Sequence, residues 1–173
     1  MSQPASGAVT LCPFERKHLA ATLAWANHPE LARLLDRTRT IAADEHERWF
    51  ASLASRADTR YFAIETGGRH VGNVWLADID ERHRKAEVRI VMGLDAVGRG
   101  CGSQALQLIA NHALGALGLR RLYAYVLAFN PRAKRAFEKA GFELEGTLRQ
   151  DRLAGGAPVD VFVLGRVNAV SRN

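Results

Sequence analysis

A glycine-rich turn between a strand pattern and a helical pattern constrains the fold of this chain more than any other feature. The turn is Gly98-Arg99-Gly100-Cys101-Gly102, and Ser103 follows it. Residues 87–92, just before the turn, are apolar and β-branched enough to predict a strand. After the turn, apolar residues recur with the spacing of one helical face, and Gly118 predicts the end of that helix. These helical residues are Leu106, Ile109, Ala113 and Leu117.

This turn is typical of a phosphate-binding loop. Three glycines remove the Cβ atoms that would keep an anion away from the backbone. Successive N–H groups are then free to point at the anion, and the N-terminus of the helix adds about half a positive charge. Arg99 adds a full positive charge beside them. We therefore expect residues 98–103 to bind a phosphorylated ligand.

Two better-known phosphate motifs do not fit. The chain contains no Gly-Lys-Ser or Gly-Lys-Thr, so it has no P-loop. Gly100, Gly102 and Ala105 match the dinucleotide fingerprint nominally, but the glycines do not directly follow the strand. About 20 residues further on, where an acidic ribose ligand is expected, the chain has Arg120 and Arg121. A nicotinamide cofactor is therefore excluded.

The remaining elements predict an α/β fold, with a mixed sheet covered by helices on both faces. Glycines 67 and 68 predict a hairpin turn, and Asn130 with Pro131 predicts the start of a helix that ends at Gly141. The expected strands are residues 9–12, 60–66, 71–79, 122–129, 142–148 and 159–163, and the other expected helices are 15–27, 29–35 and 44–55.

The size and composition predict one soluble domain that spans residues 1–173. No apolar run approaches the roughly 20 residues that a membrane span needs, and residues 1–9 carry no export signal, so we expect a cytoplasmic protein. Cys12 and Cys101 match no metal-ligand spacing, which favours free thiols and no metal. The chain has 24 Lys and Arg against 18 Asp and Glu, a net charge of +6 that favours an anionic partner.

Residues 86–142 resemble the GNAT family of N-acetyltransferases, which use acetyl-CoA. Four pieces occur in order at the family's spacing. They are the strand of residues 86–92, the turn of residues 98–102, Asn130-x-x-Ala133, and Glu138-Lys139-Ala140-Gly141-Phe142. The resemblance implies a GNAT-like, mostly antiparallel sheet of about six to seven strands with helices on both faces. It implies acetyl-CoA as cosubstrate and the amine of a small metabolite as acceptor.

The resemblance also assigns cofactor-binding residues. The pyrophosphate of CoA would lie on the main-chain amides of residues 99–103, and the pantetheine would pair like a strand beside Ile90, Val91 and Met92. Asn130 would contact the pantetheine from the other side. The family often has a tyrosine just before Glu138, and it protonates the departing thiolate; this chain has Phe137 there.

An amine must lose a proton before it attacks a thioester, so a carboxylate or histidine is needed near the strand end. Glu87 is the first candidate for this base and His83 the second. The alternative for Glu87 is a structural partner of Arg89, and for His83 a place in an exposed charged turn. No histidine is obviously paired with Cys101, which favours a structural role for that thiol over an acyl-enzyme.

The acceptor is less well defined. Trp25-Ala26-Asn27-His28 and residues 41–50 resemble the branch that acetylates nucleotide-linked amino sugars, and we prefer this acceptor because the chain is basic. Residues 71–87 resemble the spermidine acetyltransferases, for which the local carboxylates would supply an acidic cleft. These are Asp78, Asp80, Glu81 and Glu87.

Other acceptors, functions and partners stay open or are set aside. An acceptor at the N-terminus of a ribosomal protein would use the same loop, and a chain without the tyrosine could be a non-catalytic acyl-CoA-binding module. A homodimer is open. The chain shows no aromatic and basic residues interleaved as in single-strand binders, so we expect no nucleic-acid partner, and no membrane partner.

Overall fold

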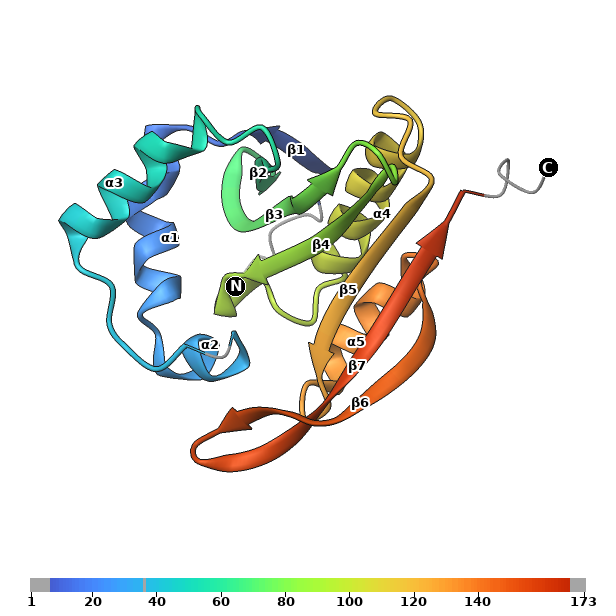
Figure 1. The fold of residues 1–173 in the computed structure, drawn as a ribbon. Coiled ribbons are helices and arrows are strands. Elements are labelled where there is room, and N and C mark those ends of the chain that lie inside the picture. Colours follow the sequence, from blue (N-terminus) through green and yellow to red (C-terminus); the bar gives the residue numbers. More distant parts are fainter. Residues whose placement is uncertain (1–6, 36, 169–173) are drawn as a thin grey trace.

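The computed structural model describes residues 7–35 and 37–168, and a seven-stranded sheet forms its centre. The strand order is β1-β2-β3-β4-β5-β7-β6, and every neighbouring pair is antiparallel except β4 and β5, which are parallel (Figure 1). This confirms the expected mixed, mostly antiparallel sheet. The strands are β1 Val9–Pro13, β2 Arg60–Thr66, β3 Arg69–Asp80, β4 Lys85–Met92, β5 Arg121–Leu127, β6 Glu143–Ala154 and β7 Ala157–Val167.

The helices lie on both sides of this sheet. Figure 1 shows α4 and α5 behind the strands, whereas α1, α2 and α3 form a group on the other side of β2 and β3. The helices are α1 Leu19–Ala26, α2 Pro29–Leu34, α3 Ala43–Leu53, α4 Cys101–Leu114 and α5 Pro131–Lys139, with short 3₁₀ turns at Arg16–His18 and Leu94–Ala96. None of the helices in the described part of the chain has the length and apolar content of a membrane span.

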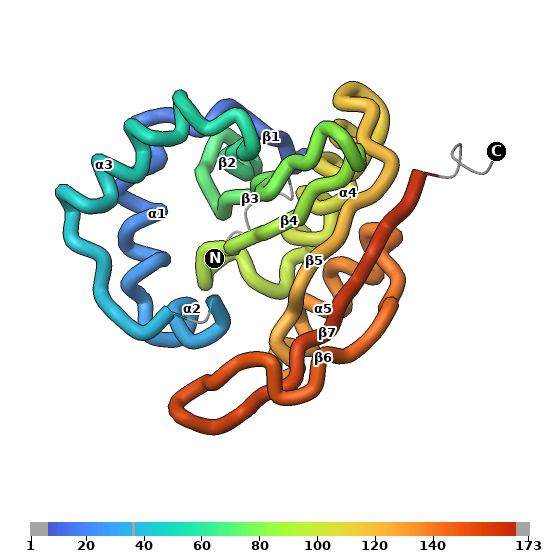
Figure 2. The backbone as a smooth tube through the Cα atoms, in the orientation of Figure 1, coloured from blue at the N-terminus to red at the C-terminus, as the bar shows by residue number. Residues whose placement is uncertain are grey.

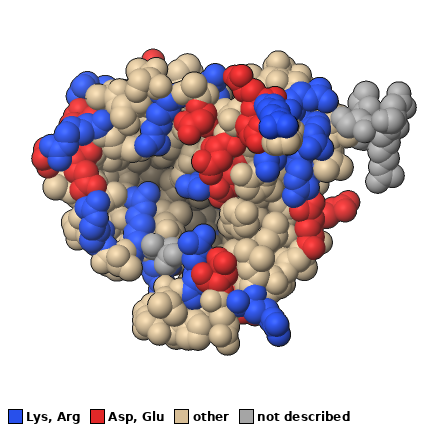
Figure 3. All heavy atoms as spheres, viewed as in Figure 1, with Lys and Arg blue, Asp and Glu red and all other residues tan. Residues whose placement is uncertain are grey.

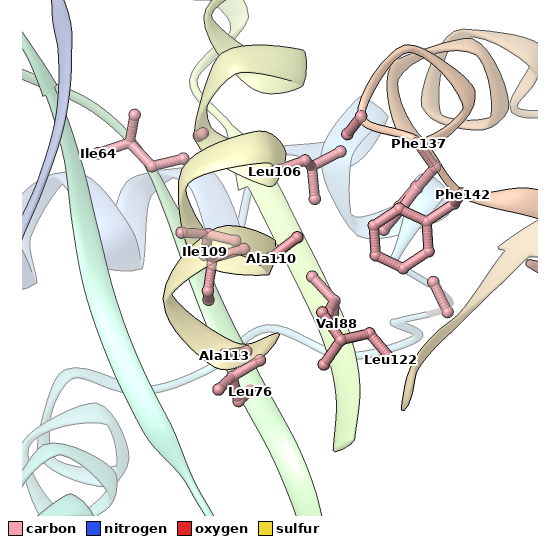
Figure 4. Close-up of a cluster of buried hydrophobic side chains, with 14 of the residues drawn as sticks. Ile64, Leu76, Val88, Leu106, Ile109, Ala110, Ala113, Leu122, Phe137 and Phe142 are labelled. Carbon is pink, nitrogen blue, oxygen red and sulfur yellow. The ribbon is translucent and has the colours of Figure 1, made fainter. Parts of the chain in front are cut away.

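Alternation along the strands separates the two faces of the sheet. On one face, Leu76 of β3 and Val88 of β4 are fully buried against α4, which contributes Leu106 and Ile109 (Figure 4). Both helix residues and Ala113 are 0% exposed, which confirms three of the four positions predicted for this face. The fourth, Leu117, lies beyond the end of α4 and is 40% exposed.

The opposite face carries an aromatic cluster. Tyr61 of β2 stacks on Trp75 of β3 with ring centroids 4.8 Å apart, and Trp49 of α3 packs edge-on against Tyr61 at 5.2 Å. Phe14 and Phe50 complete the cluster. These rings fix α3 over the sheet.

The predicted lengths of three elements, α4, β6 and β7, were wrong. Helix α4 ends at Leu114 with Gly115 as C-cap, one turn before the expected Gly118, because Gly118 closes the following turn with a φ of +64° and bonds to Gly115. Strands β6 and β7 form a much longer hairpin than expected. Nearly all of β6 is exposed, so its sequence has no apolar alternation from which its length could be predicted.

Candidate active site

Strands β4 and β5 diverge, and the divergence defines the candidate site. Their parallel pairing covers only three residue pairs and ends where Glu87 faces Tyr123. Beyond this point β4 stays paired with β3 alone, up to the pair of Met92 and Gly72. Figure 2 shows the two strands separating along this stretch. Within the described residues, the last five residues of β4 therefore have no strand on the side that faces β5.

Main-chain groups of alternate residues point into this gap. The Gly93 N–H donates to the Val71 carbonyl of β3 at 2.8 Å, and at the other end Arg120 donates to the Arg84 carbonyl from the β5 side. Because the direction alternates along a strand, the N–H and C=O groups of Ile90 and Met92 point toward the gap, whereas those of Val91 point toward β3. An extended chain can add here as a strand would.

The N-terminus of α4 lies beside this free edge. Gly100 is the N-cap, with a left-handed φ of +81°, and it has no side chain with which to cap the first turn. The N–H groups of Cys101, Gly102 and Ser103 therefore have no preceding carbonyl within the helix. A Cβ atom added at Gly102 would lie only 3.6 Å from Met92 Cγ, which shows how closely the helix start approaches β4.

Glu87 lies at the point where the strands separate. It is 6% exposed, and its Oε2 accepts a hydrogen bond of 2.6 Å from Arg89 Nη2. This bond, more than any other contact, raises the pKa of Arg89. Asp78 adds a second carboxylate, 3.8 Å from Arg89. The structure thus contains both the buried carboxylate expected of a base and the Arg89 partner expected of a structural glutamate.

Tyr123, which the sequence reasoning did not single out, shares this location. It is the β5 residue in register with Glu87, and Tyr125 packs edge-on against it with ring centroids 5.8 Å apart. Burial, and then the charges of Glu87 and Asp78, raise the pKa of Tyr123 above the ordinary value of a tyrosine. Two tyrosines at alternate positions of a strand could have indicated one common face.

The other expected catalytic residues lie elsewhere. His83 is exposed in the turn before β4, where its main-chain N–H donates to Asp80 at 2.8 Å. Cys101 is a free thiol, 8% exposed, and its side chain joins the core under α4. Neither side chain meets Glu87 in the described contacts.

Asn130 and Phe137 both belong to α5. Asn130 is its N-cap, and Oδ1 accepts from the Ala133 N–H at 3.1 Å, while its Nδ2 donates to no described residue. Phe137 is 3% exposed and packs edge-on against Phe142 in the core (Figure 4). The ring of Phe137, at the position where the family often has a tyrosine, therefore packs α5 against the core.

A cavity of about 670 Å³ opens on the aromatic face of the sheet, next to the Glu87–Arg89 pair. Figure 3 shows the hollow at the centre of the molecule. Its lining comes from α3 and the loop after it, from β2, β3 and β4, and from the segment after α2. These residues are Arg37, Trp49, Leu53, Ser55, Arg56, Ala57, Asp58, Thr59, Tyr61, Trp75, Ala77, Asp78 and Arg89.

The parallel strands β4 and β5 separate beside the uncapped, glycine-rich start of α4. This arrangement is typical of one class of binding site. It offers a free strand edge for an extended thioester arm, amides for its phosphates, and a buried carboxylate next to a separate cavity. This combination is suited to an acyl-CoA-dependent transferase.

Comparison with known proteins agrees with this class. Residues 8–143 match the acetyltransferase (GNAT) domain family, and the chain belongs to this family. It is an acetyl-CoA-dependent N-acetyltransferase. It is 28% identical over 153 residues, 88% of this chain and 82% of the other, to spermidine N(1)-acetyltransferase of Escherichia coli strain K12.

Two further relatives bear on fold and acceptor. The ribosomal-protein-serine acetyltransferase of Escherichia coli strain K12 is 28% identical over 144 residues, 82% of this chain and 76% of that protein. The solved structure of spermidine N-acetyltransferase from Vibrio cholerae, in complex with CoA and spermine, superposes with a TM-score of 0.87 at 24% identity, covering 92% of this chain and 95% of that one. This likeness shows the shared fold.

The comparisons correct one expectation. The preferred acceptor was a nucleotide-linked amino sugar, and none of these relatives supports it. Their names favour the alternative, a polyamine, and also include the ribosomal-protein acceptor. The tryptophan-rich helical segments on which the amino-sugar prediction rested serve in part as the aromatic packing of Trp49 against Tyr61.

Proposed function

We propose that acetyl transfer takes place where β4 and β5 separate, with acetyl-CoA bound along the free edge of β4. The observation that carries this proposal is the end of the β4–β5 ladder at Glu87 and Tyr123. The pantetheine would pair with the main-chain groups of Ile90 and Met92. The pyrophosphate would be bound by the uncapped amides of residues 101–103, with Arg99 beside them.

In this proposal, Glu87 is the general base. An alkylamine is protonated at neutral pH and becomes a nucleophile only after it gives up a proton. The carboxylate of Glu87 would accept that proton, directly or through a water molecule. The Arg89 guanidinium would hold the carboxylate in place through the 2.6 Å hydrogen bond.

The neutral amine would then attack the carbonyl carbon of the acetyl thioester. A C–N bond forms, the carbonyl oxygen becomes an oxyanion, and a main-chain N–H on the free edge of β4 stabilises it. The C–S bond breaks as the carbonyl re-forms. The nitrogen gives up its second proton as the amide forms, and the CoA thiolate takes up one proton through water or from a nearby acid such as Tyr123. The products are the N-acetylated amine and CoA, and the proton accepted by Glu87 returns to solvent.

The acceptor in this proposal is the primary amine of a small molecule. The names of the relatives favour a polyamine, and Asp58, Asp78 and Glu87 would provide carboxylates for an ammonium group at or beside the cavity. The wall of the same cavity also carries three arginines, and their positive charges affect which charge on the acceptor the cavity favours.

A thiol-release assay tests the proposed function. Acetyl-CoA would be incubated with the protein and with polyamines, amino acids, amino sugars and N-terminal peptides in turn, and free CoA would be measured with a thiol reagent. We expect amine-dependent release of CoA, with the acetylated product identified by mass spectrometry. CoA binding without release for any amine would contradict the proposal.

A further inference from the structure

The charges around the cavity are unusual for a site that takes a polycation. Among the described residues, its wall contains three arginines, Arg37, Arg56 and Arg89, and two carboxylates, Asp58 and Asp78. If Glu87, which bonds to Arg89, is included, three positive charges face three negative charges. A polyamine with three or four positive charges would need more unpaired carboxylates than these described residues supply, since burying a charge is costly unless it is paired.

The carboxylates nearest to the reacting groups lie on the sheet. Glu87 and Asp78 both contact Arg89, at 2.6 Å and 3.8 Å. Asp78 has a φ of +51°, and the register between β3 and β4 shifts between Ala77 and Asp80. A bulge of this kind re-aims a side chain, and here the residue concerned lines the cavity. The sheet side therefore presents two carboxylates that share one guanidinium.

Two arginines on the helix side have no such partner among residues 7–35 and 37–168. Arg37 follows α2, and Arg56 follows α3. Neither forms an ion pair with a residue in the described ranges, whereas Arg39 and Arg48 nearby are paired with Glu45 and Asp44. In Figure 3, red atoms in the hollow lie over β3 and β4, and blue atoms lie across from them on the side of the helices.

Aromatic rings lie between these two sides. Trp49, Tyr61 and Trp75 line the cavity, and the Tyr61 ring contacts both tryptophan rings. Such a surface favours a carbon skeleton rather than an extended chain of ammonium groups that keep their hydration, although a single cation can also rest on a ring face.

Resting on the proposed function for the place of the reacting amine, we propose that the acceptor is a small amine that also carries an anionic group. Its ammonium lies toward Asp78 and Glu87, its anionic group is bound by Arg37 and Arg56, and its carbon skeleton packs against the aromatic rings. Guanidinium groups bind carboxylate and phosphate alike, so both anions fit this chemistry.

Matched pairs of ligands test this inference through binding, independently of turnover. Phenylalanine against phenethylamine differs by a carboxylate, and O-phosphoethanolamine against ethanolamine differs by a phosphate; spermidine represents the polycations. Dissociation constants are measured by calorimetry on protein saturated with CoA. We expect at least one anionic member to bind about tenfold or more tightly than its partner and more tightly than spermidine. The two pairs separate carboxylate from phosphate.

Variants locate the preference. Arg56→Gln and Arg37→Gln should each remove most of the difference within the pair, while binding of the amine without the anion stays the same. Arg48→Gln is the matched control, because Arg48 lies on α3 outside the cavity lining and is paired with Asp44. A preference that survives both cavity variants overturns the inference.

The remaining outcomes also separate the two proposals. If no anionic member binds, or if spermidine binds most tightly, the inference is wrong, and CoA release with spermidine would still support the proposed function. If an anionic amine binds as expected but no amine releases CoA, the inference about the cavity stands and the proposed chemistry fails.

Discussion

Arg89 Nη2 lies 2.6 Å from Glu87 Oε2, and this pair lies where β4 loses its parallel neighbour. The Glu87 side chain is almost entirely buried, whereas the Arg89 side chain is about half exposed at 49%. The pair therefore joins the interior of the sheet to the cavity, since Arg89 also lines the cavity wall. If Glu87 is the base, as proposed, this contact would hold its carboxylate in a fixed position.

Glu87→Gln should reduce kcat by about a hundredfold or more near pH 6.5 and much less near pH 9.5. At low pH the amine is protonated and needs the base, whereas at high pH solvent removes the proton. The glutamine retains an oxygen that can accept from Arg89, so folding should be preserved. The measurement is kcat across this pH range. Glu81→Gln, in the exposed β3–β4 turn, is the control, and an equal loss at every pH would exclude Glu87 as the base.

Gly100→Asp should abolish measurable binding of CoA. The substitution places a carboxylate at the uncapped start of α4, where it caps the free amides and repels a pyrophosphate. Affinity is measured by calorimetry with CoA. Gly68→Asp is the matched control, because Gly68 also has a positive φ, +73° against +81°, but lies in the β2–β3 hairpin. Unchanged CoA affinity in Gly100→Asp would refute the assignment of the loop.

Tyr123→Phe tests the phenol opposite Glu87. A tyrosine hydroxyl is protonated at neutral pH at its ordinary pKa, so it can donate a proton to a leaving thiolate; burial raises the pKa of Tyr123, which makes it a weaker acid. We expect kcat to fall by about tenfold or more with little change in the KM for acetyl-CoA. Tyr125→Phe, two residues along the same strand, controls for the loss of a hydroxyl. If both variants are as active as the parent, the thiolate takes its proton from water.

The parts of the fold that could be predicted from sequence are those fixed by local chemistry. Helix α4 was predicted because its buried face repeats with helical spacing. The turn at its start was predicted because glycines allow a positive φ and a close approach of the backbone. The predicted length of strand β6 was too short, because an exposed edge strand has no apolar alternation from which its end could be predicted. Its length comes from pairing with β7, which is a tertiary contact.

The candidate site was predictable to a similar degree. Glu87 and the loop of residues 98–103 lie within one short stretch, and a family resemblance covers them. Arg37, Arg56 and Asp58 come from segments between helices and strands that have no periodicity, and only the packing of α3 on the sheet brings them to one cavity. Tyr123 was missed for a related reason, since its role depends on register with Glu87 across a parallel pair.

His46 should make the protein less stable as the pH falls below about 6.5. Burial, more than any other effect, lowers the pKa of His46 from its ordinary value of 6.5. The unfolded chain therefore takes up a proton in a pH range where the folded chain does not, and the free energy of unfolding falls by up to about 1.4 kcal/mol per pH unit for one such group. The fall begins near pH 6.5 and stops below the pKa of the folded state.

Urea unfolding of His46→Phe at several pH values measures this contribution. The aromatic ring can still stack on Trp49, whose ring centroid lies 4.8 Å from that of His46, but it cannot take up a proton. We expect the variant to lose less stability than the parent between pH 7.5 and pH 5.5. Some decline should remain, because burial also lowers the pKa of His70. His28→Phe, at an exposed histidine, should decline like the parent, and an identical decline in His46→Phe would show that His46 does not titrate with unfolding.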